Sequence, residues 1–200
     1  MKRNTGCLIG ASLPILTLLI IIYGFHPWFR PGIIAKKLTK SNPTSFAFEA
    51  SVDQIQAVLR KKAVKCCGRV IEFKNYAPFS ASILNLPGNE NDAYIHNFHE
   101  PIGPSAVYFS GDYPLPYICE FHLHLIPGPK GETRVVVFPH EPEVINGESW
   151  WGPHNLSPAN IYTSVAPTTI EEYRILLELG SALGEANMPP LLLPTEGGRI

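Results

Sequence analysis

An uncharged and mostly apolar run extends from Cys7 to Phe25 and limits what the rest of this chain can be. A helix needs roughly 20 apolar residues to cross the hydrocarbon core of a bilayer, and this run is just long enough. Basic residues precede it, and Tyr23 and Trp28 near its end are typical of the membrane interface. The sequence therefore predicts a single-pass membrane protein that contacts lipid through residues 7–25.

A cleaved signal peptide is the alternative for this segment. Signal peptides have a shorter apolar stretch and a small-residue cleavage site, whereas bulky aromatic residues follow this run. We therefore expect an uncleaved signal anchor. Its short basic N-terminus favours an extracytoplasmic body, while the lysines at 36–40 favour the anionic lipid of the cytoplasmic side. We expect the body to be extracytoplasmic.

The chain divides into an anchor at 1–30, a juxtamembrane linker at 31–44, a domain at 45–187 and a Pro/Leu-rich tail at 188–200. A net charge of −1 and a pI of about 6.6 give no basic surface, so we expect no nucleic-acid partner. The tail either packs on the domain as a strap or docks a partner, and we expect the strap. The sequence names no protein partner.

A capping box predicts the first helix of the body, because Ser51 and Gln54 stand three residues apart before an apolar periodicity that runs towards Lys65. A helix is also predicted to start after Pro167 and to run to about Ala186, and its apolar face should cover a curved sheet. Proline- and glycine-containing turns separate six segments with strand character: 69–74, 81–86, 93–98, 106–110, 117–126 and 133–139. The fold class is therefore α+β, with a transmembrane helix followed by one antiparallel sheet packed on a long C-terminal helix.

The last two strand segments are joined by a glycine-containing loop and predict a hairpin. Residues 140–166 show little periodicity and are expected to form a long ordered loop, of the kind that serves as a lid or a binding segment. Of the four cysteines, Cys7 lies in the anchor. Cys119 either pairs with one of the adjacent Cys66 and Cys67 or, as we expect, all three are buried and reduced.

The order of these elements resembles the helix-grip (START-like, SRPBCC) superfamily. The matching pieces are residues 45–59 and 167–184, with antiparallel strands between them. The resemblance implies a sheet that curves around the C-terminal helix and a hydrophobic ligand held between the two. Some members of the superfamily are enzymes, such as polyketide cyclases.

Two histidines on one strand are the candidate metal ligands. His122 and His124 are two residues apart, so both face the same side of the strand, and Glu120 shares that side. A His-x-His pair with a third ligand can hold zinc. In the alternative interpretation, Phe121 and its alternate neighbours face the core and the histidines belong to the polar face of the sheet.

Four residues are the candidates for binding an apolar small molecule. Trp150 and Trp151 lie in the predicted loop and either line a ligand site or anchor the loop. Tyr173 and Leu177 lie on the apolar face of the last helix, where they would line a cavity against the sheet.

No nucleophile elbow, phosphate-binding loop or dinucleotide fingerprint is present in the sequence, so we name no catalytic residue and expect no cofactor. Three hypotheses follow. The body binds an apolar or lipid-like ligand without catalysis, it is a protein-interaction module of the envelope, or it is a metal-dependent enzyme that uses His122 and His124. We favour the first.

Overall fold

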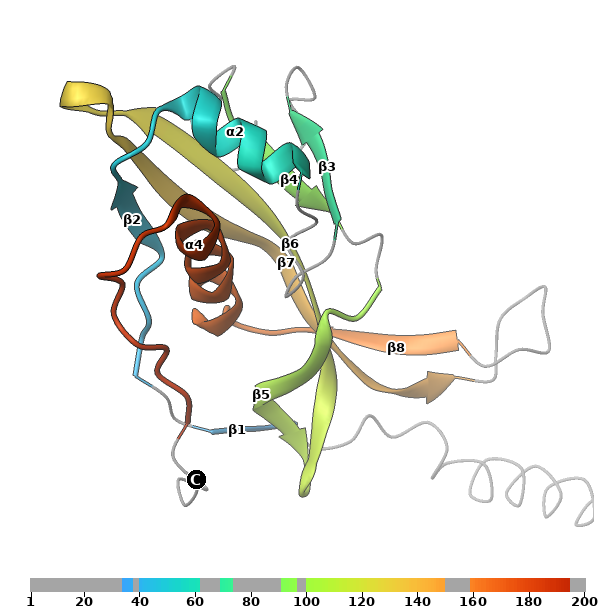
Figure 1. The fold of residues 1–200 in the computed structure, drawn as a ribbon. Helices are drawn as coiled ribbons and strands as arrows, with labels where there is room; N and C mark the ends of the chain where they lie inside the picture. Colours follow the sequence, from blue (N-terminus) through green and yellow to red (C-terminus); the bar gives the residue numbers. More distant parts are fainter. Residues whose placement is uncertain are drawn as a thin grey trace, which may run out of the picture.

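The computed structural model describes residues 34–37, 40–61, 69–73, 91–96, 100–149 and 159–194. They form an α+β domain in which a curled antiparallel sheet packs against a C-terminal helix (Figure 1). This arrangement confirms the expected class of the body. The predicted anchor at 7–25 lies outside the described residues, and within them no helix has the length and apolarity needed to cross a bilayer.

Two long strands form the spine of the sheet. Strand β6 (Tyr113–Pro127) and strand β7 (Thr133–Ser149) pair antiparallel from Pro127 opposite Thr133 to Tyr117 opposite Val144. A short 3-10 turn, Pro129–Gly131, joins them and includes Gly131 with a φ of 81°, a conformation that glycine adopts without strain. The predicted hairpin is therefore confirmed, and both of its strands are longer than expected.

The shorter strands add to the two ends of this spine. At the end near the hairpin turn, β4 (Ala93–His96) pairs with β6 and with β3 (Arg69–Phe73), and β2 (Ser45–Phe48) pairs with β7. At the other end, β5 (Gly103–Ser110) pairs with β6 and with β1 (Ile34–Lys36), and β8 (Ala159–Ser164) pairs with β7. All pairings among these strands are antiparallel, and at this second end β6 with β5 diverges from β7 with β8 in Figure 1.

The prediction of a long loop at 140–166 was wrong for much of this segment. Strand β7 continues to Ser149, and β8 covers Ala159–Ser164. Proline suggested a loop because it cannot donate a backbone hydrogen bond, but Pro142 serves β7 as an acceptor, since its carbonyl takes the N–H of Val165 at 2.9 Å. Strand β1 also lies inside the segment expected as a linker. The predicted strand at 81–86 lies outside the described residues.

Two helices cover one face of the sheet (Figure 1). Helix α2 (Val52–Lys61) begins with the predicted capping box: the Ser51 N–H donates to Gln54 Oε1 at 2.8 Å, and the Gln54 N–H donates to Ser51 Oγ at 3.3 Å. Helix α4 (Ile170–Leu183) packs against β7, β2 and α2. The core lies between these helices and the inward side of β6, which contributes Leu115, Tyr117, Cys119, Phe121, Leu123 and Leu125.

The segment after α4 packs on the domain as a strap, as far as residue 194. Met188 and Leu191 contact the hydrophobic core, and the Tyr173 hydroxyl donates to the Pro189 carbonyl. Asn42 holds the end of the strap with both ends of its amide: Nδ2 donates to the Leu192 carbonyl at 3.0 Å, and Oδ1 accepts the Leu192 N–H at 2.8 Å. Because Asn42 is buried, these bonds are shielded from water.

We predict that Asn42→Ala lowers the free energy of unfolding by about 1–3 kcal/mol, because it removes both part-buried hydrogen bonds to the backbone of Leu192. Hydrogen exchange at the Leu192 amide should accelerate. The matched control is Asn187→Ala, which removes an exposed amide from the same strap and should leave both measurements unchanged. Equal effects of the two variants would contradict the role assigned to Asn42.

Candidate metal centre

Three metal-ligating side chains meet on the outward face of the sheet, opposite to the face that the helices cover. The register of β4 and β6 places Tyr94 opposite His122 and Ala93 opposite Leu123. Asp92, which precedes β4, is therefore level with His124. Since side chains alternate along a strand, Asp92, His122 and His124 share one face while Leu123 points into the core.

The carboxylate of Asp92 bridges the two imidazoles. Its Oδ2 lies 2.9 Å from His122 Nε2, and its Oδ1 lies 2.9 Å from His124 Nδ1. The second contact is shared, because Oδ2 is also 3.1 Å from His124 Nδ1. The Leu125 N–H donates to Oδ1 at 3.2 Å and fixes the orientation of the carboxylate.

Neighbouring rings bury this group. His122 is 3% exposed and Asp92 is 2% exposed, whereas the His124 side chain is 19% exposed. Tyr94 stacks on His122 with 4.6 Å between ring centroids, and Phe138 lies 6.1 Å away on the other neighbouring strand. His124 is therefore the member of the group that solvent reaches.

The spacing of the three side chains suits a small divalent cation. One ligand atom from each lies within 4.8 Å of the others, and among the described residues this is the group of three that meets such a criterion. Ligands at 2.0–2.1 Å from tetrahedral zinc are about 3.3 Å apart. Asp92 Oδ2 is 2.9 and 3.1 Å from the two ring nitrogens, and all three ligand atoms lie within 4.8 Å of one another, so the ligands would have to rearrange around an ion.

The ring nitrogens that do not face Asp92 differ in their surroundings. A ligating histidine usually donates its second ring N–H to another group. His124 can use water for this purpose because it is partly exposed. His122 Nδ1 is buried and has no hydrogen-bond partner among the described residues. A buried nitrogen without a hydrogen bond lowers the stability of the fold, whether or not a cation is bound.

The structure thus brings together the predicted ligands His122 and His124 and adds Asp92, which the sequence interpretation missed. Glu120 shares their side of β6 but stands opposite His140, outside the cluster. The sequence alternates Asp92 and Tyr94 with Ala93 and Ile95, which are buried in the structure. This alternation was the available signal for the face on which Asp92 lies, but only the pairing of the strands places Asp92 beside His124.

The residues predicted to bind an apolar ligand lie elsewhere. Trp150 and Trp151 are outside the described residues. Tyr173 and Leu177 are on α4, on the opposite side of the sheet from the histidines. Tyr173 is fully buried in the core and bonded to the strap, and Leu177 is partly buried against the core. That prediction stays untested.

Comparisons of the chain with protein-family models, with curated proteins and with solved structures found no match. The site is therefore interpreted from its own geometry and chemistry.

A second buried carboxylate lies at the start of α4, on the helix-covered face. Glu172 is completely buried, and burial raises its pKa to about 7, although nearby backbone N–H groups of Thr169 and Glu172 itself lower it in part and Glu171 raises it further. Burial also raises the pKa values of the neighbouring Tyr117 hydroxyl and Cys119 thiol, and the charge of Glu172 adds to both shifts. Cys119 is a buried thiol in no disulfide, as expected, and Cys66 and Cys67 lie outside the described residues.

We predict that Glu172 makes the fold less stable as the pH rises. Its pKa in the folded state, about 7, exceeds the ordinary value of 4.5. The fold therefore prefers the neutral acid, and stability present below pH 4.5 is lost progressively up to about pH 7. The loss amounts to roughly 3 kcal/mol.

Denaturant unfolding of the wild type and of Glu172→Gln at pH 5 and pH 8 checks this prediction. The wild type should lose stability between the two values, and the variant should lose much less. Glu178→Gln, on the same helix but partly exposed, is the matched control and should follow the wild type. A parallel decline in all three proteins would contradict the assignment.

Proposed function

We propose that this chain is a membrane-anchored metal-binding protein, in which Asp92, His122 and His124 hold a divalent transition metal such as zinc. The observation that carries the proposal is the convergence of three ligand atoms within 4.8 Å on one buried face of the sheet. Nitrogen and carboxylate oxygen ligands are those that zinc takes in proteins. Two histidines and one carboxylate leave a further coordination position, as in sites that admit water or a substrate.

Second contacts around the ligands support the same proposal. The Leu125 N–H donates to Asp92 Oδ1, and Oδ2 faces both imidazoles. Tyr94 and Phe138 flank His122 and limit its rotation. Orientation of ligands by outer contacts of this kind strengthens metal binding.

The membrane anchor at 7–25 is part of the proposal and rests on the length and apolarity of that run. We further propose that the curled sheet and the C-terminal helix reflect the helix-grip arrangement. That arrangement would place an apolar ligand between α4 and the sheet. Tyr173, Leu176 and Leu179 are buried there within the core, so the described contacts favour the outward metal site. Shape alone does not transfer a function.

Metal titration of the full-length protein in detergent tests the proposal. After treatment with a chelator, the wild type should bind one equivalent of zinc, and cobalt(II) should give the visible spectrum of a tetrahedral site. His124→Ala and Asp92→Asn should lose binding. Because ligating histidines must be unprotonated, binding should weaken as the pH is lowered.

His140→Ala is the matched control, because its side chain is 22% exposed, close to the 19% of His124, and it lies on the neighbouring strand β7. This variant should bind metal as the wild type does. His124 is the least buried ligand, so its replacement should leave the fold intact, as circular dichroism can verify. A wild type that binds no metal, or a His124→Ala variant that binds it equally well, would overturn the proposal.

A further inference from the structure

One end of the domain combines exposed apolar side chains with lysines, and the chain enters the domain at that end. The end consists of β1, the turn between β5 and β6, and the last residues of the strap, which lie together at the bottom of Figure 1. Tyr113, at the turn, is 79% exposed. Leu192 and Leu193, in the strap, are 38% and 52% exposed.

The register of β1 fixes where the chain arrives from its N-terminal side. Ile34 pairs with Ser110 and Lys36 pairs with Tyr108, so the chain enters beside the turn that carries Tyr113 and then runs away from it. Because paired Cα atoms of antiparallel strands are about 5 Å apart, Ile34 lies close to Ser110 and to the turn that follows it. The predicted anchor ends at Phe25, nine positions before Ile34, and nine residues span at most roughly 30 Å. This end of the domain is therefore the one that the anchor holds near the bilayer.

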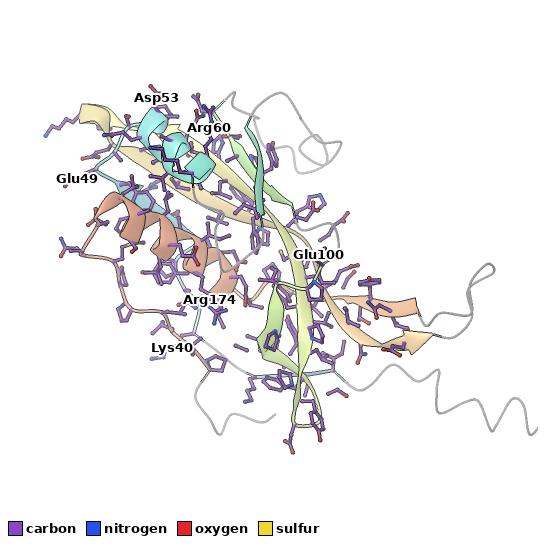
Figure 2. All side chains as sticks on the ribbon, turned by 45° about the vertical axis from the view of Figure 1, so that its right-hand side comes forward. Lys40, Glu49, Asp53, Arg60, Glu100 and Arg174 are labelled. Atoms are coloured by element: carbon purple, nitrogen blue, oxygen red, sulfur yellow. The ribbon has the colours of Figure 1, made fainter. Side chains whose placement is uncertain are left out.

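The charges of this end fit a lipid surface. Lys36 and Lys37 place their ammonium groups 5.8 Å and 4.3 Å from the ring centroids of Tyr108 and Phe109, which supports them on aromatic rings of β5. Figure 2 shows Lys40 on the side of α4 away from α2, whose residues Asp53 and Arg60 mark the opposite end. Asp112, at the turn, offsets one of these three positive charges, so the face keeps a moderate positive charge.

We propose that this end, defined by Lys36, Lys37, Tyr113, Leu192 and Leu193, docks on the surface of the bilayer that holds the anchor. Tyr113 and the two leucines would enter the interface, where tyrosine is favoured, and the lysines would contact lipid phosphates. The proposal rests on the predicted anchor and is independent of the metal site. It fixes the orientation of the domain, with the β6–β7 turn pointing away from the membrane.

Photocrosslinking tests this orientation on the full-length protein. The protein is reconstituted in nanodiscs of phosphatidylcholine and phosphatidylglycerol that contain a phosphatidylcholine with a diazirine near its headgroup. Mass spectrometry then maps the crosslinked peptides. Crosslinks are expected in the peptides that contain Tyr113 and Leu192–Leu193. The peptide that contains Ile126, which is 39% exposed beside the far turn, is the internal control and should carry none.

The variant Tyr113→Ser should lose the crosslinks at the turn, and Leu192→Ser with Leu193→Ser should lose those at the strap. Ile126→Ser should change nothing. Crosslinks that are absent from both peptides, or that occur at Ile126 equally, would overturn the docking face. Peptides from residues 7–25 report the anchor in the same sample, so failure of the anchor is distinguished from failure of the docking face, and neither outcome bears on metal binding.

Discussion

The antiparallel pairing of β6 with β7 is the interaction on which the other parts of the domain depend. It runs from Pro127 opposite Thr133 to Tyr117 opposite Val144, with a register shift between Ile118 and Glu120. Between that shift and the hairpin turn, β2 pairs with β7 and β4 pairs with β6. On the other side of the shift, β8 pairs with β7 and β5 pairs with β6. Bulges increase local twist and bend strands, which accounts for the divergence of β6 with β5 from β7 with β8 beyond the shift. A single hairpin thus organises both halves of the sheet.

The alternation of β6 then gives the two faces of the sheet different surroundings. Its inward residues meet α2 and α4 and form the core, while His122 and His124 point outward. The strand also sets distances along its length. Tyr113 begins β6, and the nine positions to His122 correspond to roughly 30 Å at 3.3 Å per residue. If the Tyr113 end lies on the membrane, the proposed metal site stands well clear of the lipid, and solutes reach it through the partly exposed His124.

Local patterns in the sequence predicted the parts of the fold that local forces determine. The Ser51–Gln54 capping box, the alternation of Phe121, Leu123 and Leu125, and the hairpin loop each depend on neighbouring residues, and each is confirmed. The shared side of His122 and His124 followed in the same way. Their position on the face of the sheet opposite to the core is also observed, and Tyr94 of another strand stacks on His122 there.

The parts that the sequence interpretation missed depend on pairing between distant segments. Strand β7 beyond Pro139 was expected as a loop, since proline cannot donate to a ladder. Pro139 is nevertheless opposite Phe121 in the sheet, and Val165 uses the carbonyl of Pro142. Asp92 was missed for a similar reason. Its contact with His122 crosses 30 positions of sequence, and only the register of β4 on β6 reveals it.

Three carboxylates of the described residues are buried, those of Asp92, Glu171 and Glu172. Asp92 and Glu172 differ in their hydrogen-bond partners, and the difference bears on the metal proposal. A buried charge is costly unless donors or counter-charges meet it. Glu172 has no hydrogen-bond partner of good geometry for either oxygen among the described residues, and its raised pKa shows that the neutral acid is favoured. Asp92 instead faces His122, His124 and the Leu125 N–H. Charge-assisted hydrogen bonds of this kind stabilise a carboxylate anion. Asp92 therefore has three hydrogen-bond partners where Glu172 has none among the described residues, and a cation at the outward site would take the place of the two imidazole N–H donors.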